Sequence, residues 1–114
     1  CGNVLHVHDV ADFVTLEAER AGGAAALWSS DPQRTYIPAV VQGPVKYVVP
    51  QYLIPGDLCT ISFRLSEPRQ QCTVRIRQGL KTLYKRQYIQ LMPSEMVRAS
   101  LTPMSGEPVE VLCE

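Results

Sequence analysis

The sequence predicts a mainly β protein in which one N-terminal helix precedes an antiparallel β-sandwich-like domain. Apolar residues recur at helical spacing only within the first thirty residues. From residue 45 onward they alternate with polar residues in short runs, and turn-forming residues separate these runs roughly every 8 to 12 positions, as in a sandwich. The 114 residues are enough for one ordinary hydrophobic core.

The predicted helix spans residues 9–30. Asp9 suits its N-cap, and Asp12 lies in the first turn, where the helix dipole favours a carboxylate. Gly22 and Gly23 each cost about 1 kcal/mol relative to alanine inside a helix, so we expect a sheet or another helix to approach them closely. The apolar face of this helix needs cover and favours a homodimer. Its members are Val10, Phe13, Val14, Ala18, Ala21, Ala25 and Trp28.

The β domain is predicted to span residues 45–114, after a linker at 31–44 that is rich in Ser, Asp, Pro and Gly. The clearest hairpin is 73–91, and a slip in the alternation of its second strand indicates a bulge. The turn spacing favours an immunoglobulin-like sandwich. Its expected strands are 45–49, 60–65, 73–77, 82–91, 96–101 and 109–113, and its expected inward residues are Ile61, Phe63, Leu65, Val74 and Ile76.

Charge and hydropathy exclude two classes of partner. The 11 basic and 11 acidic residues give a net charge of zero, whereas nucleic-acid-binding domains normally carry a basic excess. No run of 18 apolar residues is present, so we expect no membrane span. One sheet face is basic and could stack single-stranded nucleic acid, but a solvated face with edge-protecting charges explains it better. That face consists of Arg64, Arg75, Arg77, Lys85 and Arg86, with Tyr84 and Tyr88.

The four cysteines, Cys1, Cys59, Cys72 and Cys113, lie far apart, without the spacing of a zinc site. They could form two disulfides, but we expect buried thiols in a reducing, cytoplasmic compartment. Cys1-Gly2-Asn3 also matches the start of a mature bacterial lipoprotein. Such proteins continue with a flexible polar tether, whereas apolar Val4 and Leu5 follow here.

The only dense group of metal-ligating residues is His6-Val7-His8-Asp9. On a strand, His6 and His8 would share one face and could hold a metal ion. The chain has no third histidine, and its acids are expected at the surface or at helix ends. We therefore expect two polar groups at a strand–helix junction and no metal. No Ser-His-Asp or Cys-His spacing and no Gly-rich phosphate loop is present, so no catalytic residue is predicted.

The opening segment CGNVLHVHDVADFVTLEAERAGGAAA resembles the last flavin-contacting segment of FAD-dependent, NAD(P)-linked (pyridine-nucleotide) oxidoreductases with two dinucleotide-binding domains. The closest resemblance is to the subgroup found beside glycerol-3-phosphate-dehydrogenase-like proteins. The stretches PVKYVVPQYL and VRIRQGLKTLYKRQYIQLMPSEMVRASL are similar to the C-terminal β extension of that subgroup.

The resemblance implies that residues 1–30 are the remnant of an FAD-binding domain, consisting of a strand end, a turn and a helix. Gly2 would let the backbone approach FAD, and Asn3 would hydrogen-bond its ribityl–phosphate region. The helix N-terminus near Asp9 and Val10 would offer N–H groups and its positive dipole end to the flavin carbonyls.

Both Gly-rich dinucleotide fingerprints of such enzymes are absent from this chain. The chain also begins on a strand-like apolar run, so we expect the C-terminal part of an oxidoreductase that transfers hydride between NAD(P) and FAD. Its partners would be the upstream FAD- and NAD(P)-binding domains and an oxidoreductase partner subunit. By itself it should not retain FAD. The alternative is a freestanding immunoglobulin-like binding module, lipid-anchored or exported.

Overall fold

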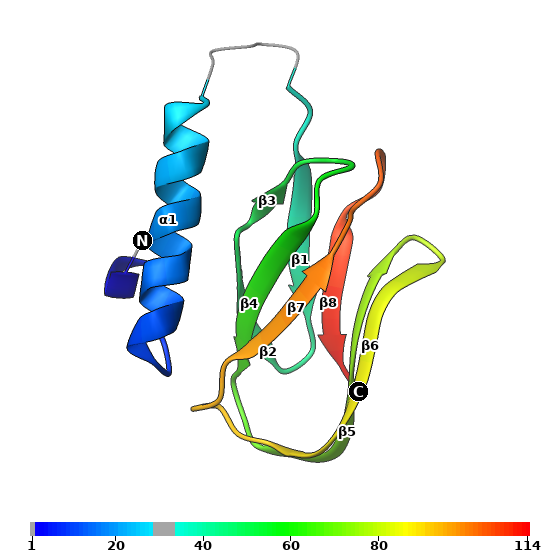
Figure 1. Cartoon of the computed structure of the whole chain (residues 1–114). Helices are drawn as coiled ribbons and strands as arrows, with labels where there is room; N and C mark the ends of the chain where they lie inside the picture. The colour runs from blue at the N-terminus through cyan, green and yellow to red at the C-terminus, as the bar shows by residue number, and fades with distance from the viewer. Residues whose placement is uncertain (1, 29–33) are drawn as a thin grey trace. The chain divides into compact units, whose positions relative to one another are not determined.

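The computed structural model describes residues 2–28 and 34–114, and the chain divides into two compact units, Cys1–Arg34 and Thr35–Glu114. The N-terminal unit contains a short 3₁₀ turn, η1 (Gly2–Val4), and one helix, α1 (Ala11–Ala26), joined by a loop (Figure 1). The predicted strand end at Val4–Val7 is wrong, because the described part of this unit offers no strand to pair with it. Within the described ranges, no helix is long and apolar enough to cross a bilayer.

Helix α1 is shorter than the predicted 9–30. Val10 is its N-cap, with extended backbone (φ −140°, ψ 150°), so Asp9 lies outside the helix and its prediction as N-cap is wrong. Asp12 does lie in the first turn, as predicted. The helix has no buried residue, and a Cβ added at Gly22 or Gly23 would meet nothing within 4 Å beyond the helix's own backbone. The close neighbour expected at these glycines is therefore not found among the described residues.

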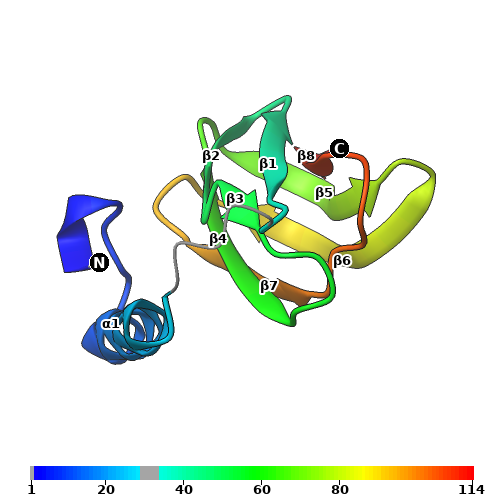
Figure 2. The same cartoon turned by 90° about the horizontal axis from the view of Figure 1, so that it is seen from above.

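The C-terminal unit is a β-sandwich-like domain, which confirms the predicted fold class of a helix followed by an antiparallel-rich β domain. One sheet has five strands in the order β3-β1-β8-β5-β6, and the other has three in the order β2-β4-β7. Figure 2 shows β4 and β7 on the side of the unit opposite β5 and β8. The strands are β1 (Ile37–Gln42), β2 (Val45–Val49), β3 (Tyr52–Leu53), β4 (Cys59–Leu65), β5 (Arg69–Gln78), β6 (Lys81–Leu91), β7 (Val97–Leu101) and β8 (Val109–Cys113).

Strand β1 lies inside the predicted linker 31–44, so that prediction is wrong for Ile37–Gln42. β1 pairs in parallel with β8, and Ala39 lies opposite Val109. Pro38 and the following Gly43-Pro44 favour a loop, but pairing with a distant strand overrides this local preference. Three predicted features lie outside the described residues: the helix end at 29–30, the linker positions 31–33 and Cys1.

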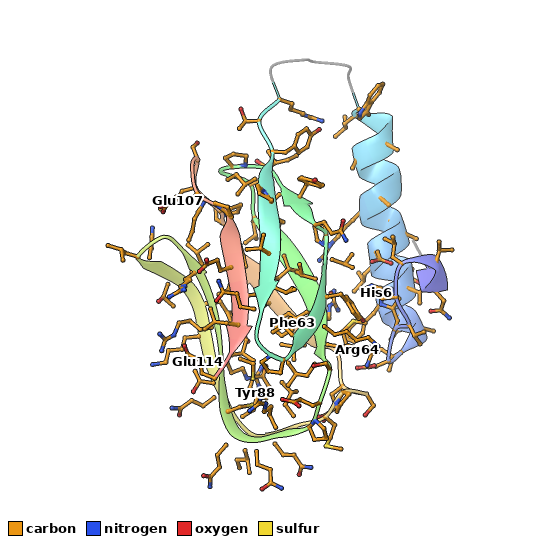
Figure 3. The ribbon with its side chains drawn as sticks, turned by 180° about the vertical axis from the view of Figure 1, so that it is seen from behind. His6, Phe63, Arg64, Tyr88, Glu107 and Glu114 are labelled. Atoms are coloured by element: carbon orange, nitrogen blue, oxygen red, sulfur yellow. The ribbon has the colours of Figure 1, made fainter. Side chains whose placement is uncertain are left out.

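The core forms between the two sheets from residues that alternate along their strands. All five predicted inward residues are buried, including Phe63 at the centre of β4 (Figure 3). Strand β8 adds Val109 and Val111, which are also fully buried. The predicted bulge is confirmed: Ile76 pairs with Tyr84 and Arg77 with Thr82, so Leu83 is the extra residue on β6.

The prediction of one basic sheet face is wrong, because Arg64 lies on β4 of the three-stranded sheet and the other four cations lie on β5 and β6 of the five-stranded sheet. Arg75 and Arg77 are paired with carboxylates. Arg77 Nε donates to a Glu110 carboxylate oxygen at 2.6 Å, and Arg75 lies 3.5 Å from the Glu114 carboxylate. Arg64 donates to the Ser94 carbonyl oxygen. These arginines are half-buried rather than fully exposed, because their aliphatic stems lie along the sheet.

Candidate functional site

The densest polar cluster of the N-terminal unit consists of His6, His8 and Glu17. Between η1 and α1 the chain alternates: His6 is only 6% exposed, whereas its neighbour Val7 is 62% exposed. Two histidines spaced by one residue therefore turn to the same side. Glu17 lies six residues into α1, about 9 Å from its first residue, because an α-helix rises 1.5 Å per residue. The loop thus runs back along the first turns of the helix that follows it.

The two imidazoles share one carboxylate. His6 Nε2 lies 3.1 Å from Glu17 Oε1, and His8 Nε2 lies 2.9 Å from Glu17 Oε2. The rings meet edge to face, with centroids 4.5 Å apart and planes at 76°. The side chains are 2% exposed for His6, 4% for His8 and 23% for Glu17. Each carboxylate oxygen therefore binds a different ring, and the cluster clamps the loop to the helix. Figure 3 labels His6, which lies beside α1.

The carboxylate of Glu17 is stabilised in its ionised form. Burial acts to raise its pKa, but the hydrogen bonds from His8 and His6 and their charges together outweigh burial, so the pKa lies below its ordinary value. The other ring nitrogen of His8, Nδ1, is buried and has no hydrogen-bond partner among the described residues. Glu17 is therefore the anionic centre on which both rings converge.

The residues predicted to contact a cofactor lie at two places on the same segment. Gly2 and Asn3 are in η1, which packs against α1, whereas Asp9 and Val10 are at the start of the helix (Figure 1). Asn3, Asp9 and Val10 are all exposed. The structure does not gather these four residues around one point, and His6 and His8 lie on the stretch of chain between them.

The expectation that the acids lie at the surface or at helix ends is wrong for Glu17, whose half-buried carboxylate contacts both histidines. The sequence does not single out Glu17, because a helical acid far from its helix end normally faces solvent. The available signal was the spacing: an H-x-H pair just before a helix, followed by an acid in the second turn of that helix. Such an acid can hydrogen-bond both histidines when the loop before the helix folds back along it.

The β unit carries a second group of titratable residues, at the junction of β5, β6 and β8. The thiols of Cys59, Cys72 and Cys113 are free, and Cys72 and Cys113 are buried as predicted. Burial and a hydrogen bond with Cys72 raise the pKa of Cys113 to about 12. Burial and a hydrogen bond with Tyr84 raise the pKa of Tyr88 to about 12 as well. Cys113 and Tyr88 hold their protons firmly and are therefore poor nucleophiles. Their role is to pack within the sandwich.

Comparison with known proteins identifies no relative of this chain: no family model, no curated protein and no solved structure matches it. Its function is therefore inferred from the chain's own residues and their arrangement.

Proposed function

We propose that this chain is the C-terminal part of an FAD-dependent, NAD(P)-linked oxidoreductase, and that its N-terminal unit covers the flavin. The parent enzyme would transfer hydride between a nicotinamide and FAD. The proposal starts from the resemblance of residues 1–26 to the last flavin-contacting segment of such enzymes. The structural observation that supports it is that α1 begins directly after the His-Val-His-Asp segment, with an N-cap residue, Val10, that makes no side-chain capping hydrogen bond.

The first turn of α1 is suited to receive a hydrogen-bond acceptor. Its N-cap is Val10, whose apolar side chain makes no capping hydrogen bond, and the Phe13 N–H donates to the Val10 carbonyl oxygen at 3.2 Å. The first N–H groups of a helix have no partner within the helix and carry the positive end of its dipole. A flavin carbonyl oxygen fits this position chemically.

The other contact of the proposed site is the η1 turn. Gly2 has no side chain to hold the cofactor away from the backbone, and the exposed Asn3 amide can both donate and accept hydrogen bonds. The clamp of His6 and His8 on Glu17 holds the intervening loop against the helix. Because the loop is already ordered, the N-terminal unit would lose less conformational freedom when the cofactor binds.

The β unit would serve a structural or assembly role in the parent enzyme. It has its own core between two sheets, and the raised pKa values of the buried Cys113 thiol and the half-buried Tyr88 hydroxyl mean that these groups hold their protons firmly. The partners implied are the upstream FAD- and NAD(P)-binding domains and an oxidoreductase partner subunit.

The first test is the upstream reading frame and its product. The frame should continue upstream of Cys1 and encode both Gly-rich fingerprints, and the longer protein should carry FAD. In that protein, Gly2→Val should lower the flavin content at least about tenfold, because a branched side chain would occupy the approach to the cofactor. Gly22→Ala is the matched control, since a Cβ there meets nothing within 4 Å, and it should leave the flavin content unchanged.

The chain alone should be colourless and should not bind FAD at micromolar concentration, because the pyrophosphate-binding loops are absent. A signal peptide directly before Cys1 would contradict the proposal and support the lipid-anchored binding module. A yellow chain with stoichiometric flavin would also contradict it, because an FAD site would then exist without the upstream domains.

A further inference from the structure

We propose that His6, His8 and Glu17 form a binding site for a zinc-class divalent cation, with Nε2 of each histidine and one Glu17 carboxylate oxygen as ligands. These three donor atoms all lie within 4.8 Å of one another. The site is complete within the N-terminal unit. It does not depend on the proposed flavin function, because the cation would bind the chain as it stands.

The donor atoms lie near the spacing of a tetrahedral site. Metal–ligand bonds of 2.0–2.1 Å place two ligands of a tetrahedral zinc about 3.3 Å apart. His6 Nε2 and His8 Nε2 lie 3.1 and 2.9 Å from the two different oxygens of Glu17, and the three donor atoms lie within 4.8 Å of one another, so side-chain shifts of up to about 1.5 Å would bring them around one ion. The Nε2 atoms that now face Glu17 are the atoms that would bind the metal. Coordination would replace the two hydrogen bonds without turning either ring over.

The donor set selects the class of metal. Two imidazole nitrogens and one carboxylate oxygen suit zinc and its transition-metal neighbours, such as cobalt and nickel. Calcium takes six to eight oxygen ligands, and magnesium requires octahedral oxygen coordination, so neither is served by this cluster. The single negative charge on Glu17 would partly neutralise the divalent ion.

Access to the cluster is one-sided. The histidine side chains are 2% and 4% exposed, whereas Glu17 is 23% exposed, so solvent reaches the cluster past the carboxylate. Three protein ligands leave one position of a tetrahedral ion for water or an external ligand, as in open zinc sites. A bound ion would tie the loop to α1 more firmly than the present hydrogen bonds do.

The test is calorimetric titration of the metal-stripped full chain with zinc chloride, and separately with calcium and magnesium chloride. One equivalent of zinc should bind at micromolar or lower concentration, and calcium and magnesium should not bind. His8→Ala and Glu17→Gln should each weaken zinc binding by on the order of 100-fold, since loss of an outer-shell partner alone costs 10–100-fold. Glu19→Gln is the matched control, because Glu19 is an exposed glutamate on the same helix.

Glu17→Gln separates a metal site from a purely structural clamp. An amide oxygen still accepts a hydrogen bond from a histidine, but it is a far poorer zinc ligand than a carboxylate. Zinc should therefore be lost while the helical circular dichroism of the variant stays that of the parent chain. If zinc affinity is unchanged in both His8→Ala and Glu17→Gln, the site assignment is wrong.

The cysteines are the competing zinc ligands, and cobalt distinguishes them. The cobalt-loaded chain should show d–d bands without thiolate-to-metal charge-transfer absorption, because the proposed ligands contain no sulfur. Strong thiolate charge transfer, or no zinc binding up to millimolar concentration, would overturn the proposal. Neither outcome bears on the flavin proposal, whose readout is the FAD content of the longer protein.

Discussion

The side-chain amide of Gln78 and the backbone of Met104 exchange two hydrogen bonds. Gln78 Nε2 donates to the Met104 carbonyl oxygen at 2.6 Å, and Gln78 Oε1 accepts from the Met104 N–H at 2.8 Å. The same Nε2 also donates to the Glu107 carbonyl oxygen at 2.6 Å. Gln78 is only 5% exposed, and it thereby fixes the loop between β7 and β8 to the end of β5.

Replacing Gln78 with leucine should destabilise the chain by about 1–3 kcal/mol, because the substitution keeps a similar volume but removes the part-buried hydrogen bonds to the backbone of Met104 and Glu107. Urea unfolding followed by circular dichroism measures this change. Gln70→Leu is the control, since Gln70 is an exposed glutamine on the same strand and should change stability by less than about 0.5 kcal/mol. Equal effects of the two variants would show that the amide network contributes nothing to stability.

The position of the core can be tested with two leucines. Leu65 on β4 is 1% exposed, whereas Leu80 in the β5–β6 turn is fully exposed. Leu65→Ala should lower the free energy of unfolding by about 2–5 kcal/mol, through lost burial and a cavity, and Leu80→Ala should leave it nearly unchanged. Thermal and urea unfolding give both values. A small effect at Leu65 would mean that the alternation along β4 has the opposite phase.

Stability should fall at alkaline pH, because the folded chain holds protons that the unfolded chain releases. The pKa of Tyr88 is raised to about 12, against about 10 for an unfolded tyrosine. Between these two values the unfolded state binds fewer protons than the folded state, so the free energy of unfolding decreases as pH rises through that window.

Urea unfolding at several pH values from 8 to 12 measures this dependence, and Tyr88→Phe should reduce its steepness above about pH 10. Tyr52→Phe is the control, since Tyr52 is exposed, and it should retain the parent slope. If the stability of the Tyr88→Phe variant falls with pH as steeply as that of the parent chain, groups other than Tyr88 cause the loss of stability at alkaline pH. Cys113, whose pKa is also raised to about 12, would be the first to examine.

The apolar face of α1 should make the chain self-associate. No residue of this helix is buried, and Val10 and Trp28 at the two ends of the predicted face are exposed. Sedimentation equilibrium should give a concentration-dependent mass approaching that of a homodimer, and the double variant Val10→Ser, Trp28→Ser should shift it toward the monomer. Leu58→Ser, an exposed leucine of the β unit, should not. A parent chain that stays monomeric at all concentrations would contradict this prediction.

Local sequence patterns predicted the strands that alternate strictly. The hairpin of β5 and β6 and its bulge at Leu83 follow from side-chain periodicity, although β5 begins at Arg69, four residues before the predicted strand. β1 could not be predicted in this way. It contains Pro38, shows no alternation, and exists because it pairs with β8, about seventy residues further along the chain.

The candidate site was predictable only in part. The His6–His8 pair is visible as a spacing, but its third member depends on how the loop turns back along α1. That turn is set at Val10, where the backbone is extended, one residue later than the cap predicted at Asp9. The exact residue at which a helix begins depends on its tertiary surroundings, and no pattern in the sequence reports this shift of one residue.

The parallel pairing of β1 with β8 has a consequence for biosynthesis. β8 occupies the centre of the five-stranded sheet, between β1 and β5, yet it is the last strand of the unit to leave the ribosome. Until it emerges, the sheet exists as two unjoined pieces with exposed edges, and the cavity later filled by Val109 and Val111 stays open. The five-stranded sheet can therefore be completed only after β8 has been translated.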